Sequence, residues 1–293
     1  MDTFAVFCHT LLLYSGRHFC SKIFSRQAFF CFIMSGMDIK TLEGIGTEII
    51  RECFNEAFSD YSVKMELSKE AFASILNDND VSLVHSVGVF DNDKLVGFIL
   101  VGVRGKRLYD SGTAVLKEYR GRGYAKAMLS FLISISSEFS TFELEVLCDN
   151  KRAIKLYDSF GFKAEREYLC FKLTSTSLDY PPPIECRKTD RSFFESYSFT
   201  FPPSWQNEKP KDIVVYKSPS GGIIVVRKSG SVAAIEAASY EEYLGIIHFA
   251  LGIYPELRFT NQWDENAKQL PQSCIFARQY GEKLQISPYN RQK

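Results

Sequence analysis

The sequence predicts an α/β protein in which strands and helices alternate, followed by a second, weaker copy of the same order of elements. Three observations predict this class. Apolar residues switch between alternating and helical spacing along the chain. A glycine-rich turn joins a predicted strand at 108–116 to an apolar helix at 124–135. A hairpin, a strand, a helix, a strand and a short helix then recur after residue 184, as in an internal duplication.

The elements of the first copy follow from periodicity, caps and turns. We expect strands at 38–42, 84–90, 95–103, 108–116, 142–148 and 163–173, and helices at 47–58, 68–76, 124–135 and 151–160. The helix at 47–58 should bury one face, made of Ile49, Ile50, Cys53, Phe54 and Phe58. Ser68 and either Asp149 or Asn150 are the expected N-caps, and Gly112 is expected to introduce a bulge.

The second copy is expected to repeat this order. Its predicted strands are at 212–217, 222–228, 231–238 and 256–261, and its predicted helices at 190–197, 240–251 and 265–270. The chain thus divides into an apolar extension at 1–36, a first domain at 37–175, a linker at 176–183 and a second domain at 184–293. With 293 residues and 45% hydrophobic content, it is long enough for two modest domains.

The extension at 1–36 is apolar, but its longest apolar run is too short to span a bilayer, and it is a poor signal peptide. We interpret it as disordered, or as the product of an upstream start, with the working protein beginning at Met34 or Met37. A membrane-seeking segment is the alternative. We expect no stable insertion into a membrane.

Charge and cysteine content exclude several classes of function. The chain has 35 basic and 35 acidic residues, so nothing global favours nucleic acid as a partner. One local group of basic residues is weak evidence for nucleic-acid binding, because Asp110 and Glu118 interrupt it. It consists of Arg104, Lys106, Arg107, Arg120 and Arg122. The eight cysteines form no C-x-x-C pair, which indicates reduced thiols in a cytoplasmic protein without a metal site.

The segment Tyr119–Ala125 carries the clearest chemical signal. A glycine-rich turn between a strand and a helix presents successive backbone N–H groups to one point, and the start of the helix adds the positive end of its dipole. Gly121 and Gly123 permit a close approach of the backbone, and Arg120 and Arg122 add charge. These features together predict a binding site for a diphosphate.

A second signature follows at Asn150–Phe162. Its apolar residues and Tyr157 fall on one helical face. The two signatures, in this order and spacing, resemble those of the GNAT superfamily of N-acetyltransferases. The residues that match are Arg120, Gly123 and Ala125 in the first motif, and Asn150, Ala153, Tyr157, Gly161 and Phe162 in the second. The resemblance covers residues 38–173.

The resemblance implies a mixed, mostly antiparallel sheet flanked by helices, whose fourth and fifth strands splay apart to admit the pantetheine arm of acetyl-CoA. Backbone groups of Val115 and Lys117 would then hold the pantetheine and the acetyl carbonyl. Asn150 would contact the cofactor, and Tyr157 would stand near the sulfur. The diphosphate would be held by Arg120, Gly121, Arg122, Gly123, Tyr124 and Ala125.

The implied reaction is direct attack of an amine on the thioester. A phenol with a pKa of about 10 can protonate the departing thiolate, so Tyr157 is the expected general acid. The amine is mostly protonated at neutral pH and needs a base. Asp110 is the leading candidate, and Glu145 is the second. The acceptor is expected to be a small-molecule or peptide amine. An inactive sensor that binds coenzyme A is the alternative function, and the oligomeric state is left open.

The second copy lacks the diphosphate loop. Its matching segment, Ala238–Tyr243, places Glu241 and Glu242 at the start of a helix, where they would repel a diphosphate. We therefore expect this half to be degenerate and not to bind coenzyme A. Trp205, Trp263 and Tyr216 either line a cleft for the acceptor or pack in the core, and core packing is the stronger expectation.

Overall fold

The computed structural model describes residues 37–60, 66–189 and 212–286. The predicted extension at 1–36, the helix predicted at 190–197 and Trp205 lie outside these residues. Within them, the helices are α3 (Thr47–Phe58), α4 (Lys69–Asp78), α5 (Tyr124–Ile135), α6 (Lys151–Asp158) and α8 (Tyr240–Leu251). The strands are β1 (Met37–Thr41), β2 (Val87–Asp91), β3 (Lys94–Arg104), β4 (Arg107–Val115), β5 (Thr141–Leu147), β6 (Lys163–Leu173), β7 (Arg187–Thr189), β8 (Ile213–Lys217), β9 (Ile223–Arg227), β10 (Ser231–Glu236), β11 (Leu257–Gln262) and β12 (Ile275–Gln285).

These strands form one sheet, and its order reads the same from both ends. The order is β1-β2-β3-β4-β5-β12-β6-β11-β10-β9-β8-β7. When β1 to β6 are matched in order with β7 to β12, the neighbours of matched strands also correspond. For example, β5 lies between β4 and β12, and its counterpart β11 lies between β10 and β6. The parallel pairs, β4–β5 and β10–β11, also correspond, and each is connected through a helix, α5 or α8. This regularity supports the predicted duplication.

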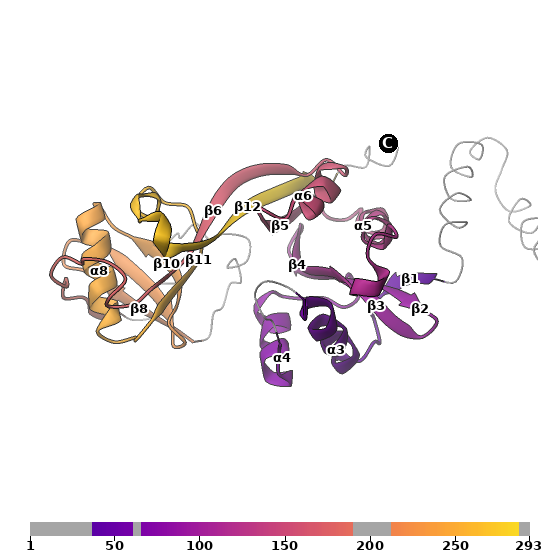
Figure 1. Cartoon of the computed structure of the whole chain (residues 1–293), viewed down its shortest axis with the longest axis horizontal. Helices are drawn as coiled ribbons and strands as arrows, with labels where there is room; N and C mark the ends of the chain where they lie inside the picture. Colours follow the sequence, from indigo (N-terminus) through magenta and orange to yellow (C-terminus); the bar gives the residue numbers. More distant parts are fainter. Residues whose placement is uncertain (1–36, 61–65, 190–211, 287–293) are drawn as a thin grey trace, which may run out of the picture.

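The central strands join the two halves of the molecule. Figure 1 shows β6 and β12 as long neighbouring strands that run between the lobe of α8 and the lobe of α5 and α6. β6 pairs with β11, and β12 pairs with β5, so each half receives a strand from the other part of the sequence. The predicted division at residues 176–183 stays a prediction, but strand pairing crosses it. An ion pair of 2.7 Å between Arg227 of β9 and Asp78 of α4 also links the halves.

Several elements differ from the sequence predictions. β12 was not predicted at all, because its apolar residues do not alternate cleanly and it contains Gly281 and Glu282. β7 was also missed. The strand predicted at 84–90 begins only at Val87, and the helix predicted at 265–270 is a short 3₁₀ turn, Ala267–Gln269. Ile49, which we expected on the buried face of α3, is 50% exposed.

We call the part of the molecule with α3, α4, α5 and α6 the first lobe and the part with α8 the second lobe. Each lobe has its own apolar core. In the first lobe, Phe54 of α3 stacks on Phe98 of β3 with ring centroids 5.9 Å apart, and α5 covers the sheet with Met128, Leu129 and other buried residues. In the second lobe, Phe171 of β6 stacks on Phe259 of β11 at 4.3 Å, beneath α8. The apolar face of each helix thus fixes which side of the sheet it covers.

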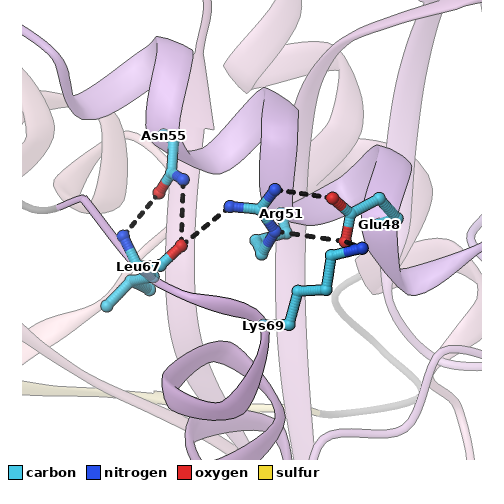
Figure 2. Close-up of polar contacts among 5 residues, drawn as sticks. All are labelled: Glu48, Arg51, Asn55, Leu67 and Lys69. Atoms are coloured by element: carbon cyan, nitrogen blue, oxygen red, sulfur yellow. Dashed lines mark hydrogen bonds and ion pairs between the residues drawn. The ribbon is translucent and has the colours of Figure 1, made fainter.

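The start of α4 is tied to α3 by polar contacts, which Figure 2 shows. Arg51 and Asn55 of α3 both donate to the carbonyl of Leu67, at 2.8 and 3.1 Å, and the Leu67 amide donates back to Asn55. Glu48 accepts from Arg51 at 2.6 Å. Ser68 caps α4 by accepting from the Ala71 amide, as predicted. These contacts hold α3 and α4 together on one side of the first lobe.

Candidate active site

The parallel strands β4 and β5 separate shortly after they begin. Their pairing covers only Arg107–Tyr109 with Thr141–Glu143, although β4 continues to Val115 and β5 to Leu147. The implied splaying of the fourth and fifth strands is therefore confirmed. The Leu116 amide donates to Val96 of β3, so the neighbouring Val115 amide points the other way, toward the open edge. This edge can offer a backbone donor to a bound acyl group.

A bulge in β4 decides which side chains face which helices. Leu100 pairs with Gly112 and Val101 with Asp110, so Ser111 is an extra residue, close to the bulge predicted at Gly112. Tyr109 lies opposite Gly102, which packs against the end of α4, and therefore faces the α3 and α4 side. Asp110 faces the opposite side, where α5 and α6 lie, and meets Tyr157 there.

The structure brings the predicted acid and the leading predicted base into contact. The Tyr157 hydroxyl donates to Asp110 Oδ2 at 3.1 Å, and the Thr113 hydroxyl donates to the same oxygen at 2.7 Å. The Gly112 amide donates to Asp110 Oδ1 at 2.9 Å. Burial raises the pKa of Asp110 despite these donors, and burial together with the charge of Asp110 raises the pKa of Tyr157 well above its usual value. Tyr157 is therefore a protonated donor at neutral pH.

The second predicted base lies on the other face of the sheet. Glu145 of β5 is half-buried, and it forms a hydrogen bond with Tyr109 of β4. Burial, followed by the charge of Glu145, raises the pKa of Tyr109 well above its usual value. Glu145 thus stands beside the splayed edges on the α3 and α4 side, separated by the sheet from the Tyr157–Asp110 pair.

The predicted diphosphate loop has the expected backbone. After a short 3₁₀ turn, Lys117–Tyr119, both Gly121 and Gly123 adopt positive φ angles of 82° and 85°, and α5 begins at Tyr124. Within the described residues, no hydrogen bond engages the amides of Gly121, Gly123 or Tyr124. A Cβ atom at either glycine would meet nothing within 4 Å, so the approach to these amides is open. The turn fits an anion with several oxygens.

The two arginines of the loop have different surroundings. The Arg120 guanidinium forms an ion pair with Asp60 at 2.8 Å and donates to the carbonyls of Ala57 and Val115, at 2.6 and 2.9 Å. It therefore ties the end of α3 to the end of β4, whereas the sequence led us to expect it at the diphosphate. Arg122 is exposed and lies over the Tyr119 ring at 5.4 Å. Arg122 is thus the loop arginine that is available to an anion.

The structure also locates three other residues that were predicted to bind the cofactor. Asn150 is the N-cap of α6, where its side chain accepts from the Ala153 amide at 3.1 Å. Lys117 is exposed, and its carbonyl accepts from the Arg120 amide. Ala125 lies in the first turn of α5, beside the loop.

Two aromatic residues that were predicted to line a cleft or pack in the core are described by the structure. Tyr216 packs on Phe249 inside the second lobe, while Trp263 is half-buried beside Tyr168.

The start of α8, the counterpart of α5, is filled by a carboxylate from the protein itself. Glu242 is 7% exposed, and it accepts hydrogen bonds from Ser218 at 2.7 Å, from Ser220 and from the Ala238 amide at 2.8 Å. Although burial opposes ionisation, these donors together hold the pKa of Glu242 below its usual value. The donors at this helix start therefore already serve an anion.

One buried acid near the site escaped the sequence analysis. Glu282 of β12 is 3% exposed and lies opposite Leu144 of β5. Burial, and the nearby charge of Asp158, raise the pKa of Glu282 to about 7. Since β12 itself was not predicted, no pattern in the sequence marked this residue as buried. In the described part of the chain, no group of side chains is arranged to hold a metal ion, and no helix is long and apolar enough to cross a membrane.

Residues 45–162 match the acetyltransferase (GNAT) family. Both motifs identified above and the splayed strands lie within this range. The chain therefore carries a GNAT acetyltransferase domain, and the protein is an acyltransferase. Comparison with curated proteins gives no match.

Solved structures share the fold of nearly the whole chain. A putative acetyltransferase from Pyrococcus horikoshii is 14% identical with a TM-score of 0.63, over 93% of this chain and 92% of that one. A GCN5-related N-acetyltransferase from Sphaerobacter thermophilus is 11% identical with a TM-score of 0.60, over 86% of this chain and 96% of that one. Another, from Anabaena variabilis, is 13% identical with a TM-score of 0.54, over 86% and 73%. At these identities the likeness concerns the fold, and it extends beyond the first half.

Proposed function

We propose that the protein is an N-acetyltransferase that transfers an acetyl group from acetyl-CoA to a primary amine by direct attack in a ternary complex. The observation that carries the proposal is the open, amide-lined turn at Gly121–Tyr124, which follows directly on the unpaired edge of β4. One coenzyme A can then place its diphosphate on the turn and its pantetheine along the strand. Arg122 and the start of α5 supply positive charge to the diphosphate.

In this proposal, Glu145 is the base and Asp110 positions Tyr157. Asp110 already accepts three hydrogen bonds and shares its face with Tyr157, whereas Glu145 is half-buried on the opposite face of the sheet. The ammonium gives one proton to Glu145. The nitrogen–carbon bond then forms, and the Val115 amide stabilises the oxyanion. The second nitrogen proton passes to solvent, and Glu145 also releases its proton to solvent before the next turnover. As the carbon–sulfur bond breaks, Tyr157 protonates the sulfur, and a proton from water restores the phenol.

The acceptor in this proposal is a small-molecule or peptide amine, and the reaction takes place in the cytoplasm, which the cysteine content supports. We further propose that only the first half binds coenzyme A, because the carboxylate of Glu242 already takes the donors at the start of α8.

Calorimetry with acetyl-CoA tests the binding step. We expect one equivalent per chain, and we expect Arg122→Glu to weaken binding about tenfold or more, since an attractive charge becomes repulsive beside the diphosphate. Arg187→Glu is the matched control, because Arg187 is exposed on β7 of the second half and its reversal changes net charge equally. No heat of binding would overturn the proposal, and two equivalents would refute the claim about the second half.

Release of free thiol from acetyl-CoA tests the chemistry. The amines to be compared are glycinamide, a peptide with an N-terminal alanine, spermidine and phenethylamine. We expect turnover with at least one of them. Binding of acetyl-CoA without turnover of any would instead favour a sensor that binds coenzyme A.

A further inference from the structure

Arg166 of β6 lies in one row of the sheet with Gly281 of β12 and Glu145 of β5. Glu145 pairs with Gly281, and Gly281 pairs with Arg166. Residues paired in this way share a face, so Arg166 lies on the face of Glu145. Neighbouring strands are about 4.8 Å apart, which puts the backbones of Arg166 and Glu145 about 10 Å apart. A Cβ atom on Gly281 would lie 2.5 Å from the Tyr168 ring, so this ring covers the middle of the row.

The Arg166 guanidinium is held by an aromatic ring. Its central carbon lies 5.0 Å from the centre of the Trp263 ring, and the residue is exposed. Within the described residues, the guanidinium has no hydrogen bond and no ion pair. A guanidinium that stacks on a ring keeps its N–H groups available at its edge, because they lie in its plane. Arg166 can therefore bind a carboxylate through two parallel hydrogen bonds.

The acids on this face already have partners. The Lys283 ammonium lies 3.5 Å from a Glu143 oxygen and 3.9 Å from a Glu165 oxygen. Glu145 is engaged by hydrogen bonding. Arg166 therefore remains a positive group without a counterion among the residues that the structure describes.

The Tyr168 hydroxyl provides a second donor beside Arg166. Tyr168 is 6% exposed, and its ring meets Trp263 in a T-shaped contact at 5.8 Å, so the two rings and the guanidinium form one cluster. In the described part of the chain, the hydroxyl has no hydrogen-bond partner, yet it is not among the unpartnered oxygens sealed from solvent. Burial raises the pKa of Tyr168 to about 12, so the phenol keeps its proton at neutral pH and can donate it to an anion.

We propose that Arg166 and the Tyr168 hydroxyl bind a carboxylate of the acceptor, so that the acceptor is an amino acid, an amine that also carries a carboxylate. The inference rests on the proposed acetyl transfer and names the substrate class of the same site. The amine would lie toward the splayed edges of β4 and β5, and the carboxylate across Gly281 toward β6. Trp263 follows β11, so the second half takes part in recognition of the acceptor without binding coenzyme A.

Thiol release from acetyl-CoA with matched pairs of amines tests the substrate class. The pairs are glycine with glycinamide, phenylalanine with phenethylamine, and 6-aminohexanoate with hexylamine, and they place the carboxylate at different distances from the amine. We expect kcat/KM for at least one acid to exceed that of its neutral partner about tenfold or more, the effect of hydrogen bonds between a carboxylate and charged donors.

The Arg166→Gln variant tests the guanidinium. With the preferred acid, we expect the KM to rise about tenfold or more, while the KM for its neutral partner changes less than about twofold. Arg166 is exposed, so the affinity for acetyl-CoA, measured by calorimetry, should show that the fold is intact. Arg187→Gln removes an exposed arginine of the second half and is the matched control, which should change neither KM.

The Tyr168→Phe variant removes the hydroxyl and keeps the ring that contacts Trp263. We expect the KM for the acid to rise about tenfold, the effect of one hydrogen bond to a charged group. Tyr240→Phe, which alters a hydroxyl in the second lobe, is its control. Equal kcat/KM for acids and neutral partners in the wild type, or an unchanged KM for the acid in Arg166→Gln, would overturn the inference while leaving the transferase in place. Absence of turnover of every amine, acidic or neutral, would overturn the proposed function and this inference with it.

Discussion

Tyr157 and Asp110 share a hydrogen bond of 3.1 Å in a buried environment, and this contact limits what each residue can do. A carboxylate that already accepts from Tyr157, Thr113 and Gly112 has little capacity left for an incoming ammonium. A phenol whose pKa is raised by burial and by a neighbouring acid stays protonated until negative charge develops beside it. This geometry supports the proposed role of the pair beside the leaving group.

Replacing Tyr157 tests its role as the acid. We expect Tyr157→Phe to lower the turnover number about 100-fold, because the variant cannot protonate the departing sulfur. Its affinity for acetyl-CoA should be unchanged, since the loop at Gly121–Tyr124 is intact. Steady-state thiol release and calorimetry measure the two quantities. Tyr180→Phe, which loses a hydroxyl bound to the Thr174 carbonyl, is a control for removal of a phenol. Unchanged turnover in Tyr157→Phe would remove this residue from the mechanism.

Glu282 predicts a dependence of stability on pH. Its pKa is about 7 in the fold and near 4.5 in the unfolded chain, so the neutral form is favoured by folding. Its contribution to stability is complete below about pH 4.5 and is lost as the pH rises through about 7. Glu282→Gln should therefore raise the free energy of unfolding at alkaline pH by about 3 kcal/mol relative to the wild type.

Thermal unfolding of both proteins at several pH values measures this difference. The stabilisation by Glu282→Gln should be absent below about pH 4.5, grow between about pH 4.5 and 7, and be complete above about pH 7. In acid the Glu282 side chain is neutral in both states, so the apolar surroundings and the charge of Asp158 then have no effect on it. An equal difference at every pH would mean that Glu282 does not titrate in the folded protein.

At the scale of elements, local patterns predicted the helices well. α3, α4, α5, α6 and α8 follow from apolar spacing, and Ser68 and Asn150 cap α4 and α6 as expected. Such features depend on residues within a turn or two of each other. The turn at Gly121–Gly123 was predictable for the same reason, because a positive φ favours glycine wherever the rest of the chain lies.

β12 was not predictable in this way. Its burial depends on β5 and β6, which pair with it from more than a hundred residues away in the sequence. Gly281 and Glu282, which break its strand pattern, make sense only beside Tyr168 and Leu144. The bulge at Ser111 is similar, since Gly112 indicated it but only the pairing with β3 shows which side Asp110 faces.

At the scale of the whole molecule, the exchange of strands makes the two halves depend on each other. A chain that ends at residue 183 would lack both β12 and β11, so β6 would lose both of its neighbours and β5 would lose one. We expect this chain to show no cooperative unfolding transition and to aggregate through its unpaired strand edges. A chain that begins at Met37 keeps every described element and should unfold like the full protein.

Calorimetric unfolding and analytical gel filtration compare these chains. A monomeric chain ending at residue 183 that unfolds cooperatively and binds acetyl-CoA would show that the first half is independent. Loss of folding in the chain beginning at Met37 would contradict the interpretation of residues 1–36 as dispensable.

The sequence by itself determined α3, α4, α5, α6 and α8, the glycine turn at Gly121–Gly123 and the resemblance to acetyltransferases, because glycines, caps and apolar spacing act over a few residues. It also indicated the duplication. Only the tertiary structure decided that β12 lies between β5 and β6, that Arg120 is engaged by Asp60, and that the Tyr168 ring covers Gly281. These features arise from contacts between distant parts of the chain, and no local pattern of residues specifies which distant partner a strand or side chain meets.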